Sequence, residues 1–120
     1  MKEMSALLVG GQGTYLKGHY YTEHPDRDLS VNHAASVGTV ASAGHYTHVV
    51  CCGGFTQRQT PDLSEAQSFE NMWAETQTRP PQTVILEETS LDSAENVIFG
   101  LMQLRMEEGN RPIVRIGFYS

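Results

Sequence analysis

The sequence has few basic residues and no long apolar run, and both shortages narrow the range of functions. Eight Lys and Arg stand against 14 Asp and Glu, giving a formal net charge of −6 over 120 residues. Because phosphate backbones bind basic surfaces, this balance argues against a nucleic-acid partner. No stretch reaches the roughly 18 apolar residues of a membrane span, and the amino-terminal segment lacks a signal peptide's apolar region. We therefore expect a cytoplasmic protein with no membrane partner.

Cysteine is also scarce, and the two cysteines, Cys51 and Cys52, are neighbours. Adjacent cysteines rarely form a disulfide, because the resulting ring strains the peptide bond between them. Cys-x-x-Cys and His-x-x-x-His spacings are absent, which argues against a metal centre. Gly-x-Ser-x-Gly is absent too, so a serine hydrolase is not indicated. We predict two reduced thiols near the end of a strand.

Apolar runs alternate with amphipathic stretches along the whole chain. This alternation predicts an α/β fold: a three-layer, Rossmann-like parallel sheet of about four strands, with helices on both faces. Residues 1–120 suit one domain. Residues 14–28 are predicted to be a long loop, whose tyrosines and histidines either line a pocket or pack the loop onto the body. The expected strands are 5–9, 47–52, 83–86 and 113–119, and the expected helices are 30–43, 61–76 and 92–108.

Local signals set the expected helix ends. Thr60 and Pro61 are typical of a cap and a first helical residue. Asp92 and Glu95 have the spacing of a capping box at the start of the third helix, and Gly109 is expected to end that helix.

Glycines follow the first two expected strands. Gly10, Gly11 and Gly13 come after the first strand, and Gly53 and Gly54 come after the second. The carboxyl ends of parallel strands meet at one edge of a sheet, where open α/β sheets bind ligands. Backbone N–H groups at such glycines can approach a phosphate or a carboxylate. The alternative for the first group is a simple turn, since it is not a dinucleotide-binding fingerprint.

Acidic and polar residues gather where the third strand gives way to the third helix. Glu87 directly follows the apolar run of that strand, and capping alone does not explain its position. Carboxylates here can accept ribose hydroxyls, hold an ammonium group, bind a divalent cation or act as a general base. Glu65, near the start of the preceding helix, is either a further ligand-binding acid or an acid favoured by the helix dipole. The candidate residues of this corner are Glu65, Glu87, Ser90, Ser93, Glu95 and Asn96.

These motifs resemble those of the Rossmann-like family of unknown function that includes YdcF, SanA and ElyC. Three segments carry the resemblance: 8–11, then 49–54 with 64–66, and above all 87–96, which is similar to the family's Glu-x-x-Ser-x-Asn-Thr-x-Glu-Asn. Cys52 replaces the usual serine before the glycine pair, and His33 stands where the family often has an arginine. The family domain continues past the fourth strand, so the resemblance implies a carboxy-terminally truncated form.

The resemblance implies a site for a small molecule. The ligand is expected to be nucleotide-like, with S-adenosylmethionine as a candidate cofactor, and no reaction is implied. Two alternatives stay open. One is a metal-dependent hydrolase or transferase that uses Glu65, Glu87 and Glu95. The other is a non-catalytic paralogue whose uncovered sheet edge makes it a homodimer or an interaction module.

Overall fold

The computed structural model describes residues 2–11, 13–22 and 30–120. Its main sheet has four parallel strands in the order β5-β4-β1-β6. This arrangement confirms the predicted α/β, Rossmann-like fold, because strands distant in the sequence pair side by side through helical crossovers. The strands are β1 Met4–Gly10, β4 His48–Cys52, β5 Thr83–Glu87 and β6 Ile113–Tyr119.

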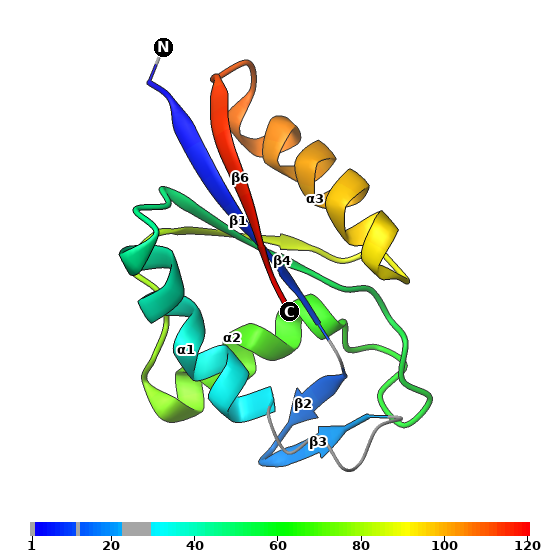
Figure 1. The fold of residues 1–120 in the computed structure, drawn as a ribbon. Helices are drawn as coiled ribbons and strands as arrows, with labels where there is room; N and C mark the ends of the chain where they lie inside the picture. The colour runs from blue at the N-terminus through cyan, green and yellow to red at the C-terminus, as the bar shows by residue number, and fades with distance from the viewer. Residues whose placement is uncertain (1, 12, 23–29) are drawn as a thin grey trace.

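Three helices cover the two faces of the sheet, as predicted. Figure 1 shows α1 and α2 on one side of the sheet and α3 on the other. Within the described residues, no helix is long and apolar enough to cross a membrane. The helices are α1 Ser30–Ala43, α2 Glu65–Thr76 and α3 Ser93–Glu108.

The core lies on both sides of β1, which is buried along its whole length. On the side of α1 and α2, Trp73 donates its indole N–H to the carbonyl of Ala34 at 2.7 Å and so joins the two helices. On the side of α3, the core is smaller, and Gly100 lets the helix approach Cys52 closely. The α3-side core contains Met4, Ala6, Leu8, Val50, Cys52, Ile85 and Leu104.

The prediction of a long loop over residues 14–28 is wrong for its first part. Residues 14–21 form a hairpin, β2 Thr14–Leu16 and β3 His19–Tyr21. Its two-residue turn has positive φ at both Lys17 and Gly18, the conformation that matches the twist of paired strands. Residues 23–28 of the predicted loop lie outside the described residues.

The hairpin is fixed to α2 by polar contacts. The Tyr15 backbone N–H donates to Ser68 Oγ at 2.9 Å, and Asn71 Nδ2 donates to the Tyr15 carbonyl at 2.8 Å. Tyr15 itself is buried in the core. At Tyr15, therefore, the aromatic side chain packs the hairpin onto the body.

The second helix begins at Glu65, four residues later than predicted. Ser64 is its cap, since the Ser64 hydroxyl accepts the backbone N–H of Gln67 at 2.9 Å. Thr60 does not cap the helix; its hydroxyl is hydrogen-bonded to Thr14 at 2.6 Å in the interior. The sequence Ser64-x-x-Gln67 is itself a capping-box pattern, and it prevails over the proline signal at Pro61.

The caps predicted for the third helix are confirmed. Asp92 Oδ1 accepts the Glu95 N–H at 2.8 Å, and Glu95 Oε1 accepts the Leu91 N–H at 2.8 Å. Gly109 closes the helix with a φ of 67°. The two side-chain caps at the start fix the direction in which α3 leaves the sheet edge.

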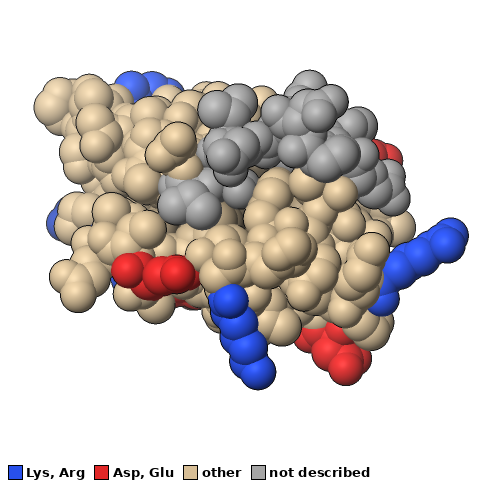
Figure 2. Space-filling view, turned by 90° about the horizontal axis from the view of Figure 1, so that it is seen from below, with Lys and Arg blue, Asp and Glu red and all other residues tan. Residues whose placement is uncertain are grey.

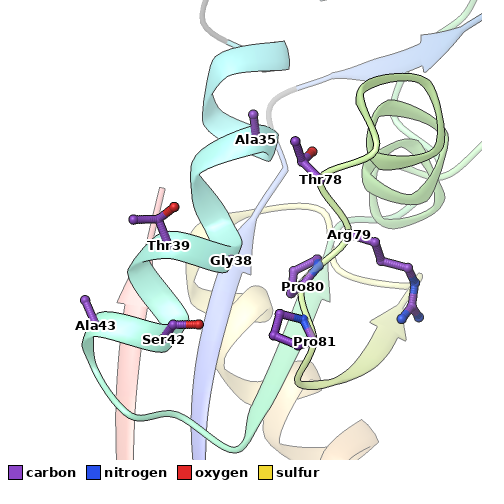
Figure 3. A pocket seen from close by; sticks show the side chains of 9 residues that line it. All are labelled: Ala35, Gly38, Thr39, Ser42, Ala43, Thr78, Arg79, Pro80 and Pro81. Carbon is purple, nitrogen blue, oxygen red and sulfur yellow. The ribbon is translucent and has the colours of Figure 1, made fainter.

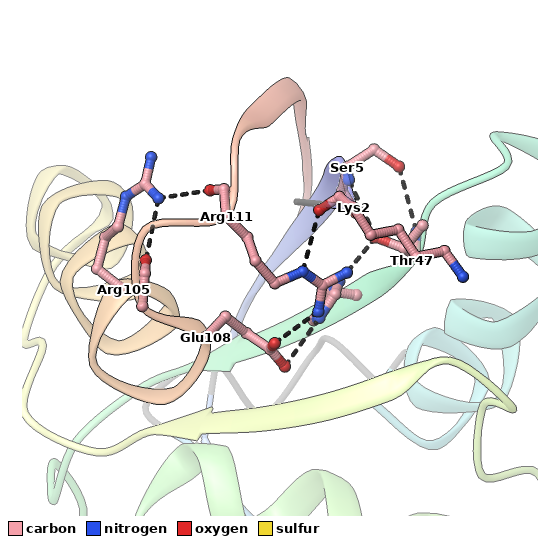
Figure 4. Close-up of polar contacts among 8 residues, drawn as sticks. Lys2, Ser5, Thr47, Arg105, Glu108 and Arg111 are labelled. Atoms are coloured by element: carbon pink, nitrogen blue, oxygen red, sulfur yellow. Dashed lines mark hydrogen bonds and ion pairs between the residues drawn. The ribbon is translucent and has the colours of Figure 1, made fainter.

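Polar contacts tie the amino-terminal ends of the strands together (Figure 4). Glu108, at the end of α3, accepts from Arg111 at 2.6 Å and is 3.1 Å from His48 of β4. Arg111 in turn donates to the Lys2 carbonyl at 3.1 Å. These contacts are far from the predicted site and hold the opposite end of the sheet.

Candidate site at the carboxyl edge of the sheet

The site is built on the last residues of three neighbouring strands. The register pairs Gly10 of β1 with Cys52 of β4, and Cys52 with Glu87 of β5. Glu87 is therefore the final residue of its strand, which was predicted to end at Leu86. Because side chains alternate between the two faces of a sheet along each strand, Cys52 and Glu87 point to the face that α3 covers.

Glu87 is buried, with 1% of its surface exposed. Its Oε2 atom accepts the backbone N–H groups of Thr89 at 2.6 Å and Ser90 at 2.8 Å, and the Thr89 hydroxyl at 3.0 Å. Its Oε1 atom is buried and has no hydrogen-bond partner in the described part of the chain. One oxygen thus shapes the turn into α3, and the other is left to accept a further hydrogen bond.

Ser90 and Asn96 form the wall beside Glu87. The Ser90 hydroxyl donates to Asn96 Oδ1 at 2.6 Å, and both side chains are buried. The amide nitrogen of Asn96 lies 3.1 Å from the place where a Cβ on Gly10 would be. A side chain at position 10 would therefore push Asn96 away from the strand end.

Gly53 and Gly54 join the β4 end to the turn after β5. Their N–H groups donate to the carbonyls of Glu87 at 3.0 Å and Ser90 at 2.8 Å. Their own carbonyls accept from the first residues of α2. A Cβ on Gly54 would lie 2.9 Å from the Ser90 carbonyl oxygen. The predicted meeting of this glycine pair with the 87–96 segment is therefore present.

Glu65 lies across both glycine turns. Its side chain occupies the space that a Cβ on Gly11 or Gly53 would take, at distances of 2.5 to 2.9 Å. It is buried, and burial raises the pKa of its carboxyl, although a 2.6 Å hydrogen bond from Thr56 partly opposes this. Oε2 accepts that bond, and Oε1 lies against the two glycine turns.

Three predicted site residues are not part of this arrangement. Gly13 lies under the hairpin, against Tyr20 and the Tyr21 carbonyl. Glu95 is engaged in the cap of α3, and Ser93 is exposed on the first turn of that helix. The structure brings together the other eight: Gly10, Gly11, Gly53, Gly54, Glu65, Glu87, Ser90 and Asn96.

One group on the α1 side of the same edge was not among the predicted site residues. His33 stacks on Tyr119, with ring centroids 4.5 Å apart and planes 24° apart. Burial lowers the pKa of His33, and a hydrogen bond to the Gly10 backbone partly opposes this. Its Nε2 atom is buried and has no hydrogen-bond partner among the described residues. Only the resemblance pointed to this position, and spacing alone gave no signal.

Thr56 was missed as well. It lies in the segment between β4 and α2, which has no periodic pattern. A threonine there is usual in a loop, so nothing in the sequence distinguished it as the partner of Glu65.

The cysteines are free and buried, as predicted. Burial, with a smaller effect from Glu87, raises the pKa of Cys52 to about 12, and burial raises the pKa of Cys51 well above its ordinary value. Both stay protonated at neutral pH, so neither is a reactive nucleophile.

Two further features lie outside the candidate site. In the described part of the chain, no group of three or more His, Cys, Asp or Glu side chains is placed to hold a metal ion. A shallow groove, lined mostly by small side chains and by Arg79, runs between α1 and residues 78–81 (Figure 3). It contains Gly38, Ser42 and Pro80, which lie on the amino-terminal side of the strands and contribute nothing to the carboxyl edge.

Charged side chains are few on the face seen from below the view of Figure 1. Figure 2 shows them separated from one another, with no basic cluster on the visible part of this face. No ion pair between described residues involves Glu65 or Glu87. Within these residues, therefore, no cationic side chain is paired with either carboxylate of the site.

Comparisons with protein-family models, curated proteins and solved structures found no match to this chain.

Proposed function

We propose that the carboxyl edge binds a small polar molecule through hydrogen-bond donors of the ligand. The observation that carries this proposal is the buried Oε1 atom of Glu87, which lacks a hydrogen-bond partner in the described part of the chain, together with the nearly buried carboxylate of Glu65. Buried polar atoms normally have a partner. A ligand hydroxyl or ammonium group would supply it.

The position of Glu65 narrows the class of ligand. The glycine turns were expected to receive an anionic group, but the Glu65 carboxylate already lies on both of them. A phosphate placed there would meet a negative charge in a partly desolvated site, which is unfavourable. A nucleoside or a cationic nucleoside derivative such as S-adenosylmethionine fits better, because its ribose hydroxyls and ammonium group are donors.

The order of strands and helices agrees with the YdcF, SanA and ElyC resemblance. Ser90, Glu87 and Asn96 of the shared motif are the residues that make the corner. On this basis we propose that the chain is a member of that family whose site favours donor-rich ligands. His33, which borders Gly10, would then line the opposite side of the same ligand.

Thermal denaturation with a ligand panel tests the proposal. The panel contains adenosine, S-adenosylmethionine, AMP and ATP at millimolar concentration. A ligand at ten times its Kd stabilises the fold by about 1.4 kcal/mol, a rise in Tm of roughly 5 °C for a chain of this size. We expect a rise with adenosine or S-adenosylmethionine and a smaller one, or none, with ATP. No rise with any compound would contradict the proposal.

Matched variants connect binding to the two carboxylates. Glu65→Gln and Glu87→Gln keep the side-chain size but weaken acceptance from an ammonium or hydroxyl donor, and each should lower the ligand-induced rise. Glu107→Gln on the exposed face of α3 is the control and should leave the rise unchanged.

The metal-dependent alternative has less support. It requires Glu65, Glu87 and Glu95 to share one ion, but Glu95 Oε1 is bonded to the Leu91 N–H. Calorimetric titration with Mg²⁺, Mn²⁺ and Ca²⁺ discriminates the two, since binding abolished by Glu65→Gln would favour a hydrolase or transferase.

A further inference from the structure

One face of β6 carries apolar side chains that the described helices leave exposed. Val114, Ile116 and Phe118 are 45 to 57% exposed. Ile116 and Phe118 pair with Ala6 and Leu8 of β1, which α3 covers, so both point to the α3 side of the sheet; Val114 lies at the register shift between Ile113 and Arg115. α3 itself packs over β1, β4 and β5. Figure 1 shows β6 at the edge of the sheet, beside α3 and not beneath it. We call these three side chains the β6 shelf.

The outer face of α3 also carries a row of exposed apolar side chains. Ile98, Met102 and Met106 are 55 to 76% exposed and follow one another at intervals of four residues. Residues four apart form a row along one side of a helix. We call this row the α3 ridge. Exposed apolar rows of this kind often mark an interaction surface, and the described residues leave this one uncovered.

We propose that a second copy of this chain covers both surfaces in a two-fold symmetric dimer. The α3 ridge of each subunit packs on the β6 shelf of the other. In a two-fold interface the same surface serves both subunits, so a chain that offers one ridge and one shelf on the same side is self-complementary. The two α3 helices would then lie side by side between the two sheets.

The exposed apolar area of the ridge and shelf supports a second copy of the chain as the partner. The ridge and shelf, with the exposed neighbours Leu91 and Val97, comprise eight side chains that are 40 to 76% exposed. At on the order of 100 Å² each, they present roughly 800 Å², the share of one partner in a standard protein interface. The largest apolar patch of a typical monomer is about 300–600 Å². Together these eight side chains expose more apolar surface than that.

Charge also favours a second copy. Arg115 is the only charged residue of β6, and its guanidinium lies over the Tyr46 ring, 4.2 Å from the ring centre, on the α1 side. It therefore does not interrupt the shelf. Ridge and shelf carry no charge, so neither repels its counterpart.

Light scattering after size exclusion tests the dimer. The wild-type chain, at 13.3 kDa per subunit, should elute with twice that mass at 100 μM. Met102→Lys in the ridge and Ile116→Glu in the shelf should each give monomers with an unchanged circular dichroism spectrum, because both positions are exposed. Leu16→Lys, at an exposed apolar residue of the hairpin, is the matched control and should stay dimeric.

Mixing the two monomeric variants tests the geometry. In a mixed dimer, one contact would bring the lysine introduced by Met102→Lys against the glutamate introduced by Ile116→Glu, and the second contact would be native. We expect the mixture to recover dimers. A monomeric wild type, a dimer that survives both single variants, or a mixture that stays monomeric would each overturn the proposal. The ligand experiments are independent of these outcomes.

Discussion

Glu65 lies in the space that a side chain on Gly53 would need: a Cβ at position 53 would be 2.5 Å from the Cβ of Glu65. Gly53 also has a φ of 154°, a conformation that residues with a side chain rarely adopt. The end of β4 and the start of α2 thus pack closely at this point, and the Glu65 carboxylate lies over the backbone of Gly53.

Gly53→Ala should therefore destabilise the fold strongly. We expect a loss of about 3 kcal/mol or more in the free energy of unfolding, from backbone strain together with the contact to Glu65. Gly109→Ala is the matched control, because Gly109 has a positive φ of 67° but no described atom within 4 Å of the place where its Cβ would lie; it should lose less, roughly the 1–3 kcal/mol of backbone strain alone. Urea denaturation measures both, and equal losses would show that the contact with Glu65 has no effect.

Glu65→Gln should stabilise the protein at neutral pH. Since burial raises the folded-state pKa of Glu65 above 4.5, the folded state binds the proton more tightly than the unfolded state. The free energy of unfolding then falls as the pH rises from about 4.5 through the folded pKa, by about 1.4 kcal/mol for each tenfold difference in proton affinity.

Glutamine keeps an oxygen for Thr56 but has no charge to bury. Denaturation of wild type and variant between pH 4.5 and pH 8 should give a flatter curve for Glu65→Gln. Glu107→Gln, at an exposed position, should follow the wild type. A Glu65→Gln curve parallel to that of the wild type would refute the role given to burial.

The two thiols should resist alkylation in the native state. With a pKa of about 12 for Cys52, roughly one thiol in ten thousand is ionised at pH 8, and both side chains are buried. Incubation with iodoacetamide followed by mass spectrometry should show modification only after urea is added. Rapid labelling of the native protein would mean that the β4 end opens easily.

Trp73→Phe should lower stability by about 2 kcal/mol or more. The change removes the hydrogen bond to the Ala34 carbonyl, leaves that buried acceptor without the indole donor and opens space between α1 and α2. Trp73 is the single tryptophan, so circular dichroism should follow unfolding in both proteins. An unchanged midpoint would mean that α1 re-forms its contacts without the indole.

The fold could be predicted from the sequence because its strands are continuous apolar runs. Val49 and Val50, for example, are buried on opposite faces of β4, and such runs are typical of parallel strands. The hairpin was missed because its strands have three residues each and its turn is Lys17-Gly18, which lacks the usual Asn-Gly signal. The start of α2 was misplaced because two cap signals compete within five residues.

The site could be predicted only in part. Spacing placed Glu87, Ser90 and Asn96 together, since all three depend on one strand-to-helix turn. It could not show that the Glu95 side chain is bonded within the cap of α3, or that Gly13 lies against the hairpin, because both depend on three-dimensional packing. The direction of the Glu65 side chain was equally inaccessible, because it depends on how the start of α2 packs against the two glycine turns.

The pairing of β1 with β6 determines when the sheet can be completed during synthesis. β1 pairs with β4 on one side and with β6 on the other, from Met4 beside Ile113 to Val9 beside Tyr119. Contacts this distant in sequence slow folding, because a long loop must close first. A nascent chain therefore keeps one edge of β1 unpaired until β6 leaves the ribosome, and in that interval the exposed strand is open to chaperones or to aggregation.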